Sequence, residues 1–135
     1  MSQEVALVTG GCGLVGFHIV KALLQDPNFS SIHVVSRNPT KNLLTGVQYH
    51  AGSISCGEDV RALFSNIQPT VVFHVASPAS EGSSAGFNYF YDANVVGIKL
   101  LLEHAMKSQA TKFFICALRI TPIYGERDNQ MIPGL

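Results

Sequence analysis

Short apolar runs alternate along the chain with longer segments in which apolar side chains recur at helical spacing. The first run, Val5–Val8, is closed by Thr9 and a pair of glycines, so it predicts a buried strand. The segment after it predicts a helix that ends before Asp26-Pro27, and its apolar positions are Leu14, Val15, Ile19, Val20, Leu23 and Leu24. The same patterns predict strands at Ile32–Ser36, Val47–His50 and Val71–Val75, with a short helix at Glu58–Asn66.

A long helix is expected from Asn88 to Met106, and its apolar face carries Val95, Ile98, Leu101, Leu102 and Ala105. Lys112–Cys116 opens a fifth strand. Strands that alternate with helices, and that are apolar without a polar alternation, are typical of a parallel sheet covered on both faces. The sequence therefore predicts an α/β fold with a doubly wound parallel sheet of about five strands, in one domain that spans residues 1–135.

Composition narrows the kind of partner and the compartment. The chain has 135 residues, of which 47% are hydrophobic, and nine basic residues balance nine acidic ones. No basic field is present to recruit nucleic acid, so a small molecule is the expected partner. No apolar run approaches the roughly 20 residues of a membrane span, and the three cysteines form no CxxC pair. We expect a cytoplasmic protein, and peripheral attachment at the endoplasmic reticulum stays open.

A glycine-rich loop separates the first strand from the first helix. The segment TGGCGLVG, Thr9 to Gly16, contains both GxGxxG and the overlapping TGxxGxxG. Such glycines permit a tight turn, close approach of the backbone to a pyrophosphate, and close packing of helix on strand. The pyrophosphate would meet the free N–H groups and the positive dipole end of the helix that starts near Leu14. This strand–turn–helix context predicts an NAD(P)-binding Rossmann fold, and a purely structural glycine turn is the alternative.

The end of the second strand bears on the choice of nicotinamide cofactor. An acidic residue there would accept hydrogen bonds from a free ribose 2′-hydroxyl, but this chain has Ser36-Arg37. A guanidinium can bind a 2′-phosphate, so NADP(H) is favoured over NAD(H). Alternatively, Arg37 is only a solvated loop residue. The five histidines show no HExxH or other metal-ligand spacing, so no metal site is expected.

Four segments together resemble the extended short-chain dehydrogenase/reductases. They are TGGCGLVG, VVFHVASP (residues 71–78), NVVGIKLLLEHA (residues 94–105) and LRITPIYGERD (residues 118–128). Within that superfamily, the sequence is most similar to the 3β-hydroxysteroid dehydrogenase/isomerase group, including the sterol-4α-carboxylate 3-dehydrogenases. The resemblance implies an NAD(P)-dependent oxidoreductase that acts on the 3β-hydroxy group of a sterol in steroid biosynthesis.

The resemblance also implies roles for individual residues. The glycine loop would hold the pyrophosphate, Ser36 and Arg37 the adenosine ribose, and Ser53-Ile54 the adenine, although relatives often carry Asp-Ile there. Asn94 matches the Asn that supports the family's catalytic proton relay, and a satisfied polar group in a helix is its alternative. The HVASP segment would line the cofactor, unless it is only a strand end and turn. The expected cofactor-binding residues are Gly10, Gly11, Cys12, Gly13, Leu14, Val15, Gly16, Ser36, Arg37, Ser53, Ile54, Ala76, Ser77 and Pro78.

The catalytic residues of this superfamily are missing from the sequence. In this superfamily a tyrosine and a lysine stand in a Tyr-x-x-x-Lys motif on one helix, and the lysine lowers the pKa of the tyrosine. None of the four tyrosines, at positions 49, 89, 91 and 124, has a lysine four residues later, and no serine follows the fifth strand. Parallel neighbouring strands need a crossover of a dozen or more residues, and none separates Cys116 from Ala117. We therefore expect an internal deletion near residues 116–117 and a chain truncated at its C-terminus.

Two further hypotheses stay open. One is a non-catalytic nucleotide-binding or interaction isoform, which self-associates through uncovered sheet or pairs with a full-length relative. The other keeps the enzyme class but changes the substrate to a nucleotide sugar or a flavonoid-like ketone, within another extended short-chain dehydrogenase subfamily.

Overall fold

The structure is a computed structural model, and it describes residues 3–78, 86–108, 110 and 112–115. Its core is one parallel sheet of five strands in the order β3-β2-β1-β4-β5. The strands are β1 (Glu4–Thr9), β2 (Phe29–Ser36), β3 (Gln48–Ala51), β4 (Val71–His74) and β5 (Lys112–Ile115). The predicted doubly wound α/β fold is confirmed.

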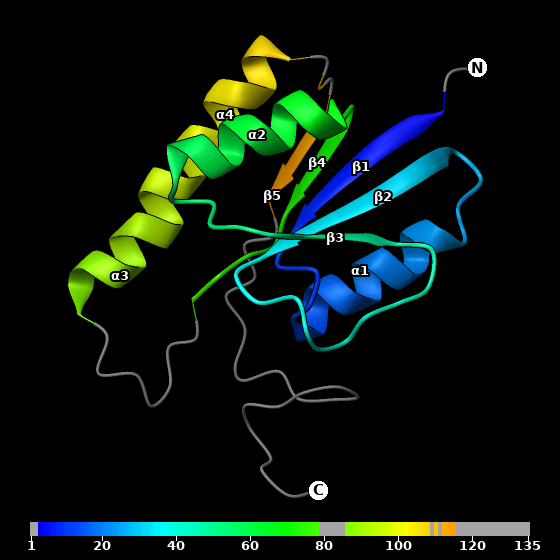
Figure 1. Cartoon of the computed structure of the whole chain (residues 1–135), viewed down its shortest axis with the longest axis horizontal. Coiled ribbons are helices and arrows are strands. Elements are labelled where there is room, and N and C mark those ends of the chain that lie inside the picture. The colour runs from blue at the N-terminus through cyan, green and yellow to red at the C-terminus, as the bar shows by residue number, and fades with distance from the viewer. Residues whose placement is uncertain (1–2, 79–85, 109, 111, 116–135) are drawn as a thin grey trace, which may run out of the picture.

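Helices cover both faces of the sheet (Figure 1). On one face lies α1 (Leu14–Leu24), and on the other lie α2 (Gly57–Ile67) and α4 (Gly97–Lys107). The strand residues alternate between these layers, so that Ala6 and Val8 pack against α1 while Leu7 packs against α2 and α4. The central strands β1, β2 and β4 are therefore apolar on both faces, which explains their unbroken apolar runs.

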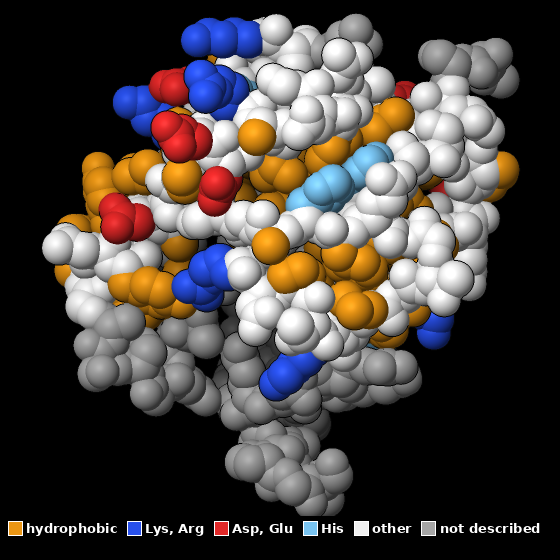
Figure 2. All heavy atoms as spheres, in the orientation of Figure 1, with side chains coloured by type: hydrophobic (Ala, Val, Ile, Leu, Met, Phe, Trp, Pro, Cys, Tyr) orange, Lys and Arg blue, Asp and Glu red, His pale blue; other side chains and the backbone are white. Residues whose placement is uncertain are grey.

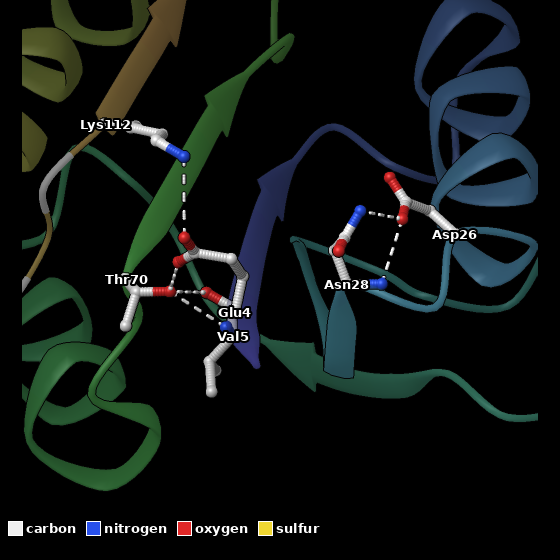
Figure 3. Close-up of polar contacts among 6 residues, drawn as sticks. All are labelled: Glu4, Val5, Asp26, Asn28, Thr70 and Lys112. Carbon is white, nitrogen blue, oxygen red and sulfur yellow. Dashed lines mark hydrogen bonds and ion pairs between the residues drawn. The ribbon is translucent and has the colours of Figure 1, made fainter. Parts of the chain in front are cut away.

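The first helix buries only part of the expected set: Val20 and Leu23 are buried, and so is Phe17, which was not among the expected positions. Phe17 is 3% exposed and contributes to the core, whereas Leu24 is 38% exposed. The helix ends at Leu24, and the turn to β2 is closed by Asp26, whose Oδ1 accepts hydrogen bonds from the Asn28 backbone N–H at 2.9 Å and from its Nδ2 at 2.7 Å (Figure 3). The second strand then starts at Phe29, three residues before the predicted start.

The long helix contains an irregular turn that the sequence pattern did not predict. It consists of α3 (Phe87–Tyr91), a π-helical turn η1 (Asp92–Val96) and α4. A π turn inserts one extra residue, which rotates the preceding helical segment relative to the segment after it. Val95 and Leu102 were expected on the buried face, but they are 45% and 36% exposed. Only Leu101 and Ala105 of the predicted face are fully buried.

The amino edge of the sheet is fastened by a polar cluster (Figure 3). The Thr70 hydroxyl donates to the Glu4 carboxylate and accepts from the Val5 backbone N–H at 2.9 Å. Lys112 Nζ lies 3.5 Å from Glu4 Oε1, with its side chain 56% exposed. These contacts join β1, β4 and β5 at the end of the sheet opposite the glycine loop.

The last described strand, β5, pairs with β4 along its whole length. Phe113 packs against the core beside α4, while Phe114 stacks on Phe73 with ring centroids 5.2 Å apart and remains half exposed. The predicted junction at Cys116-Ala117 lies outside the described residues.

Candidate functional site

The carboxyl ends of β1, β2 and β4 converge beside the start of α1 (Figure 1). The chain runs from β1 outward to β2 and β3, and then crosses back to place β4 on the other side of β1. The strand order therefore reverses between β1 and β4. In open α/β sheets, ligands bind at the carboxyl edge of such a reversal.

The glycine loop is packed too tightly for side chains at three of its positions. Gly10 has φ +73°, and a Cβ there would lie 2.7 Å from the backbone of Ala76. A Cβ on Gly16 would lie 2.1 Å from the carbonyl oxygen of Gly10, and one on Gly11 would lie 2.7 Å from both γ-carbons of Val34. The loop is thus pressed against β2, against the segment after β4 and against its own helix, which explains why the sequence requires glycine here.

The first turn of α1 presents uncapped backbone N–H groups at this edge. Gly13 is the N-cap residue, in extended conformation with φ −82°, and no side chain caps the helix. Gly13 itself donates its N–H to Gly10 O at 3.1 Å, which closes the turn. The N–H groups of the first turn have no partner within the helix, and they carry its positive dipole end. This arrangement suits an anion such as a pyrophosphate.

A buried hydrogen-bond network joins the ends of β1 and β4. Thr9 Oγ1 accepts the backbone N–H groups of Val75 and Ala76, each at 3.2 Å, and lies 2.7 Å from His74 Nδ1. Because the oxygen already accepts twice, its own hydrogen is assigned to Nδ1. Burial lowers the pKa of His74, which favours the neutral imidazole that this assignment needs. The network holds Ala76 against Gly10, and only the HVASP motif pointed to it in the sequence.

Cys12 ties the glycine loop to the segment after β2. Burial raises the pKa of its thiol, partly offset by a hydrogen bond with the Ser36 side chain. The Cys12 carbonyl accepts a hydrogen bond of 2.9 Å from Asn42 Nδ2. Asn42 adopts φ +54°, a left-handed conformation that asparagine tolerates better than most residues. Asn42 was not predicted as a site residue, because no local motif marks a contact across 30 positions.

Arg37, directly after β2, contacts α3. One terminal nitrogen of its guanidinium donates to the Tyr89 hydroxyl at 3.1 Å, and Cζ lies 5.5 Å from the centroid of that ring. Tyr89 was not predicted as a site residue either.

Ser53 and Ile54 follow β3 at the same edge of the sheet. The Ser53 N–H donates to Asp59 Oδ2 at 2.8 Å, which fixes this turn to the start of α2. Ile54 packs against the start of α4, where a Cβ on Gly97 would lie 2.9 Å from its side chain. Ser53 and Ile54 are thus held between the starts of α2 and α4.

The remaining predicted residues divide into two groups. Ala76, Ser77 and Pro78 directly follow β4, so they lie at the carboxyl edge with the glycine loop. Asn94 lies within η1, where its side chain is exposed and makes no hydrogen bond with another described residue. The structure therefore brings the predicted cofactor-binding residues together at one edge and leaves Asn94 on a helix surface.

The three described tyrosines, none of which has a lysine four residues later, lie in different environments. Tyr49 accepts the Leu44 N–H at 2.8 Å, and burial raises its pKa, whereas a catalytic tyrosine needs a lowered one. Tyr89 contacts Arg37, and Tyr91 stacks on Phe87 with centroids 5.8 Å apart. Tyr124 lies outside the described residues. Within the described ranges there is also no group of three potential metal ligands, and no helix long and apolar enough to cross a bilayer.

Comparison with known proteins gives one family match and many structural neighbours. The family described as "NAD dependent epimerase/dehydratase family" matches residues 6–134. Human short-chain dehydrogenase/reductase family 42E member 1 is 30% identical over 105 residues, which cover 75% of this chain and 26% of that protein. UDP-glucose 4-epimerase of Thermotoga maritima, solved with UDP-glucose, superposes with a TM-score of 0.72 and 31% identity, over 82% of this chain and 36% of that one.

A third relative was solved with a dinucleotide. UDP-glucose 4-epimerase of Thermus thermophilus, in complex with NAD, has a TM-score of 0.69 and 30% identity, over 80% of this chain and 35% of that chain. The chain thus spans about a quarter to a little over a third of the length of these relatives.

Proposed function

Because the chain belongs to the NAD-dependent epimerase/dehydratase family of extended short-chain dehydrogenase/reductases, we propose that it binds a nicotinamide dinucleotide through its glycine loop. The observation that carries this proposal is the packing of the loop, in which Gly10 and Gly16 leave no room for a Cβ and the first turn of α1 is uncapped. The complex of the Thermus thermophilus relative with NAD supports it. Residues 1–135 would then form part of an NAD(P)-binding domain.

Each part of the dinucleotide has candidate partners at the carboxyl edge. The pyrophosphate would lie on the N–H groups of the first turn of α1. The adenosine ribose would lie near Ser36 and Arg37, and the adenine near Ser53 and Ile54. Ala76, Ser77 and Pro78 would line the half of the dinucleotide beyond β4. Nicotinamide, when bound, accepts or supplies a hydride; this chain's residues bind and orient it.

NADP(H) is the favoured form of the cofactor in this proposal. No carboxylate stands directly after β2, and Arg37 offers a positive charge there. A solvated Arg37 without a role predicts no such preference. The Thermus thermophilus relative was solved with NAD, so the affinities of this chain for NADPH and NADH must be compared to decide between the two cofactors.

The proposed substrate is a 3β-hydroxysteroid or sterol, by the resemblance of the HVASP and NVxGxxxLLE segments to that group. A nucleotide sugar is the second candidate, because the Thermotoga maritima neighbour carries UDP-glucose. A whole protein acting on a sterol would work at the surface of the endoplasmic reticulum, with peripheral attachment there as part of this proposal.

This chain by itself should bind cofactor weakly. It should also transfer hydride poorly, because no tyrosine has a lysine four residues later. It could then act as a non-catalytic isoform that pairs with itself or with a full-length relative. Exposed apolar side chains on α3, η1 and β5, including Phe87, Val95 and Phe114, support such pairing.

Calorimetric titration of the purified chain with NADPH and NADH tests the proposal directly. We expect measurable binding of both, with NADPH the tighter ligand. Gly13→Ala serves as the matched variant, because its affinity for both should fall while it remains folded. Binding of neither dinucleotide to the wild-type chain would reject the cofactor role, and tighter binding of NADH would reject NADP preference. Turnover of a 3β-hydroxysterol or of UDP-glucose at the rate of an intact enzyme would contradict the expected loss of catalysis.

A further inference from the structure

Arg37 and Tyr89 connect two parts of the carboxyl edge that lie 52 residues apart in the sequence. Arg37 directly follows β2, and Tyr89 lies in α3, the helical segment that precedes η1. The Tyr89 hydroxyl accepts a guanidinium N–H at 3.1 Å, while Cζ stands 5.5 Å from the centroid of the same ring. Two different interactions thus restrain one exposed arginine.

The contact leaves the charge and most of the donors of Arg37 available. Tyr89 takes a single N–H, and the remaining guanidinium donors have no hydrogen-bond partner among the described residues. No carboxylate lies within ion-pair distance of Arg37 in the described ranges, where Lys112–Glu4 forms the ion pair. A neutral phenol therefore orients the guanidinium and leaves its positive charge in place, whereas a carboxylate partner would neutralise that charge.

Orientation of an arginine matters for the recognition of phosphate. A long flexible side chain loses rotamer freedom when it binds, and a restrained planar guanidinium loses less for each hydrogen bond that it forms. Tyr89 is itself half-buried, and its N–H donates to Gly86 O at 3.0 Å in the first turn of α3. The tyrosine that restrains Arg37 is therefore itself held in a helical segment.

We propose that Tyr89 is a positioning residue: it holds the Arg37 guanidinium in an orientation from which its N–H groups can donate to the 2′-phosphate of the adenosine ribose. Tyr89 thereby contributes to the choice of NADP(H). This inference rests on the proposed function, because it requires the adenosine ribose to lie at Ser36-Arg37. Selectivity between NADP(H) and NAD(H) would then depend on a residue of α3 as well as on the residues at the end of β2.

Binding of two small probes isolates the effect from the nicotinamide and from catalysis. Adenosine 2′,5′-bisphosphate carries the 2′-phosphate, and adenosine 5′-monophosphate lacks it; calorimetry gives the affinity of the full chain for each. Tyr89→Phe removes the hydroxyl and keeps the ring, Tyr89→Leu removes both, and Arg37→Ala removes the charge. Tyr91→Phe is the matched control, because it removes a phenol two residues away on the same helical segment that does not contact Arg37.

For the bisphosphate, we expect Tyr89→Phe to weaken binding about twofold to fivefold and Tyr89→Leu about fivefold to tenfold, as for exposed cation–π and hydrogen-bond contacts. Arg37→Ala should remove the preference for the bisphosphate altogether. The affinity for the monophosphate should stay unchanged in the two Tyr89 variants, which also shows that they are folded, and Arg37→Ala should unfold in urea at the same midpoint as the wild type. Tyr91→Phe should match the wild type with both probes.

Three results would overturn the inference in distinguishable ways. Unchanged or tighter bisphosphate binding in the Tyr89 variants, with the preference lost in Arg37→Ala, refutes the role of Tyr89 and leaves the proposed function intact. Equal affinity of the wild-type chain for both probes refutes the role of Arg37, and that of Tyr89 with it. Failure of the wild-type chain to bind either probe refutes the proposed function itself.

Discussion

Replacement of Gly16 by alanine should damage both stability and cofactor binding. The added Cβ would lie 2.1 Å from the carbonyl oxygen of Gly10, more than an ångström inside ordinary van der Waals contact, and 2.7 Å from its carbonyl carbon. Both contacted atoms belong to the backbone, so no side chain can rotate away. The first turn of α1 must therefore move away from the glycine loop.

The size of the effect follows from two opposing contributions. Overpacking costs about 1–3 kcal/mol, and the rigid backbone contact places Gly16→Ala at the upper end. Alanine regains about 1 kcal/mol in helix propensity, which leaves a net loss of about 2 kcal/mol. For a domain of this size, that loss lowers Tm by roughly 5–8 °C. Displaced N–H groups also lose charge-assisted hydrogen bonds to the pyrophosphate, so dinucleotide affinity should fall at least about tenfold.

Two matched variants separate the contributions. Gly13→Ala would bring its Cβ only to 3.4 Å from Gly10 O, at a φ that any residue adopts. Because alanine is a poorer N-cap than glycine, stability should fall by no more than about 1 kcal/mol, while cofactor affinity falls. Gly57→Ala on α2 would place its Cβ 3.9 Å from Leu100 and should stabilise the chain by up to about 1 kcal/mol. Urea unfolding and calorimetric titration measure both properties. A Gly16→Ala chain as stable as the wild type, with unchanged affinity, would refute the packing argument.

Three further predictions concern other polar groups. Burial lowers the pKa of His33 and of His50, whose ring nitrogens lie 3.0 Å apart, so the unfolded chain binds protons more readily than the folded chain. The free energy of unfolding should therefore stay constant above about pH 6.5 and fall below that pH. The fall should be shallower in His50→Gln, and a flat profile in the wild type would contradict the prediction. Thr9→Val removes the side-chain partner of the part-buried Ala76 N–H and of the buried His74 Nδ1, while Val75 keeps its bond to the Thr9 carbonyl, and it should cost about 2 kcal/mol in urea unfolding. The exposed control Thr40→Val should be neutral, and equal effects would count against the network. Lys112→Ala breaks an exposed ion pair and should change stability by less than about 0.5 kcal/mol, so a larger loss in the same assay would show that the pair matters more than its exposure suggests.

The histidine pair behind the pH prediction was not anticipated from the sequence. His33 and His50 lie on neighbouring strands, and their rings stack with centroids 5.3 Å apart. Figure 2 shows histidine side chains together on the viewed face, with apolar side chains around them. Strand pairing creates this contact across 17 positions, and no spacing rule for metal sites or catalysis would select it.

The sheet could be predicted because its order follows from local patterns. Apolar runs such as Val71–His74 separate cleanly from helical spacing, and the right-handed crossovers of parallel strands leave few topologies. The start of β2 was missed because Ser30 and Ser31 interrupt the apolar run, yet Ser31 pairs with Val5. The π turn was missed because it changes the helical phase although its own residues, Asp92–Val96, include no Gly or Pro; Gly97 stands directly after it.

The candidate site was predictable only where its residues are close in sequence. The glycine loop could be recognised because Gly10, Gly13 and Gly16 stand at a spacing with a physical meaning. The Arg37–Tyr89 contact depends on how α3 lies beside the end of β2, and a linear pattern does not contain that information. Whether the predicted residues contact a cofactor remains a prediction for the titrations above.

The contact between Gly10 and Ala76 also has a consequence for the order of folding. During synthesis, the glycine loop leaves the ribosome early, but the Thr9–His74 bond that completes its surroundings spans 65 positions. Closing so distant a contact carries an entropic cost, and long-range pairing of parallel strands is slow. A nascent chain that ends before β4 therefore holds the phosphate-binding motif without the neighbouring backbone that shapes it. Dinucleotide affinity should thus first appear when β4 has docked beside β1, which makes the ligand a reporter of completed folding.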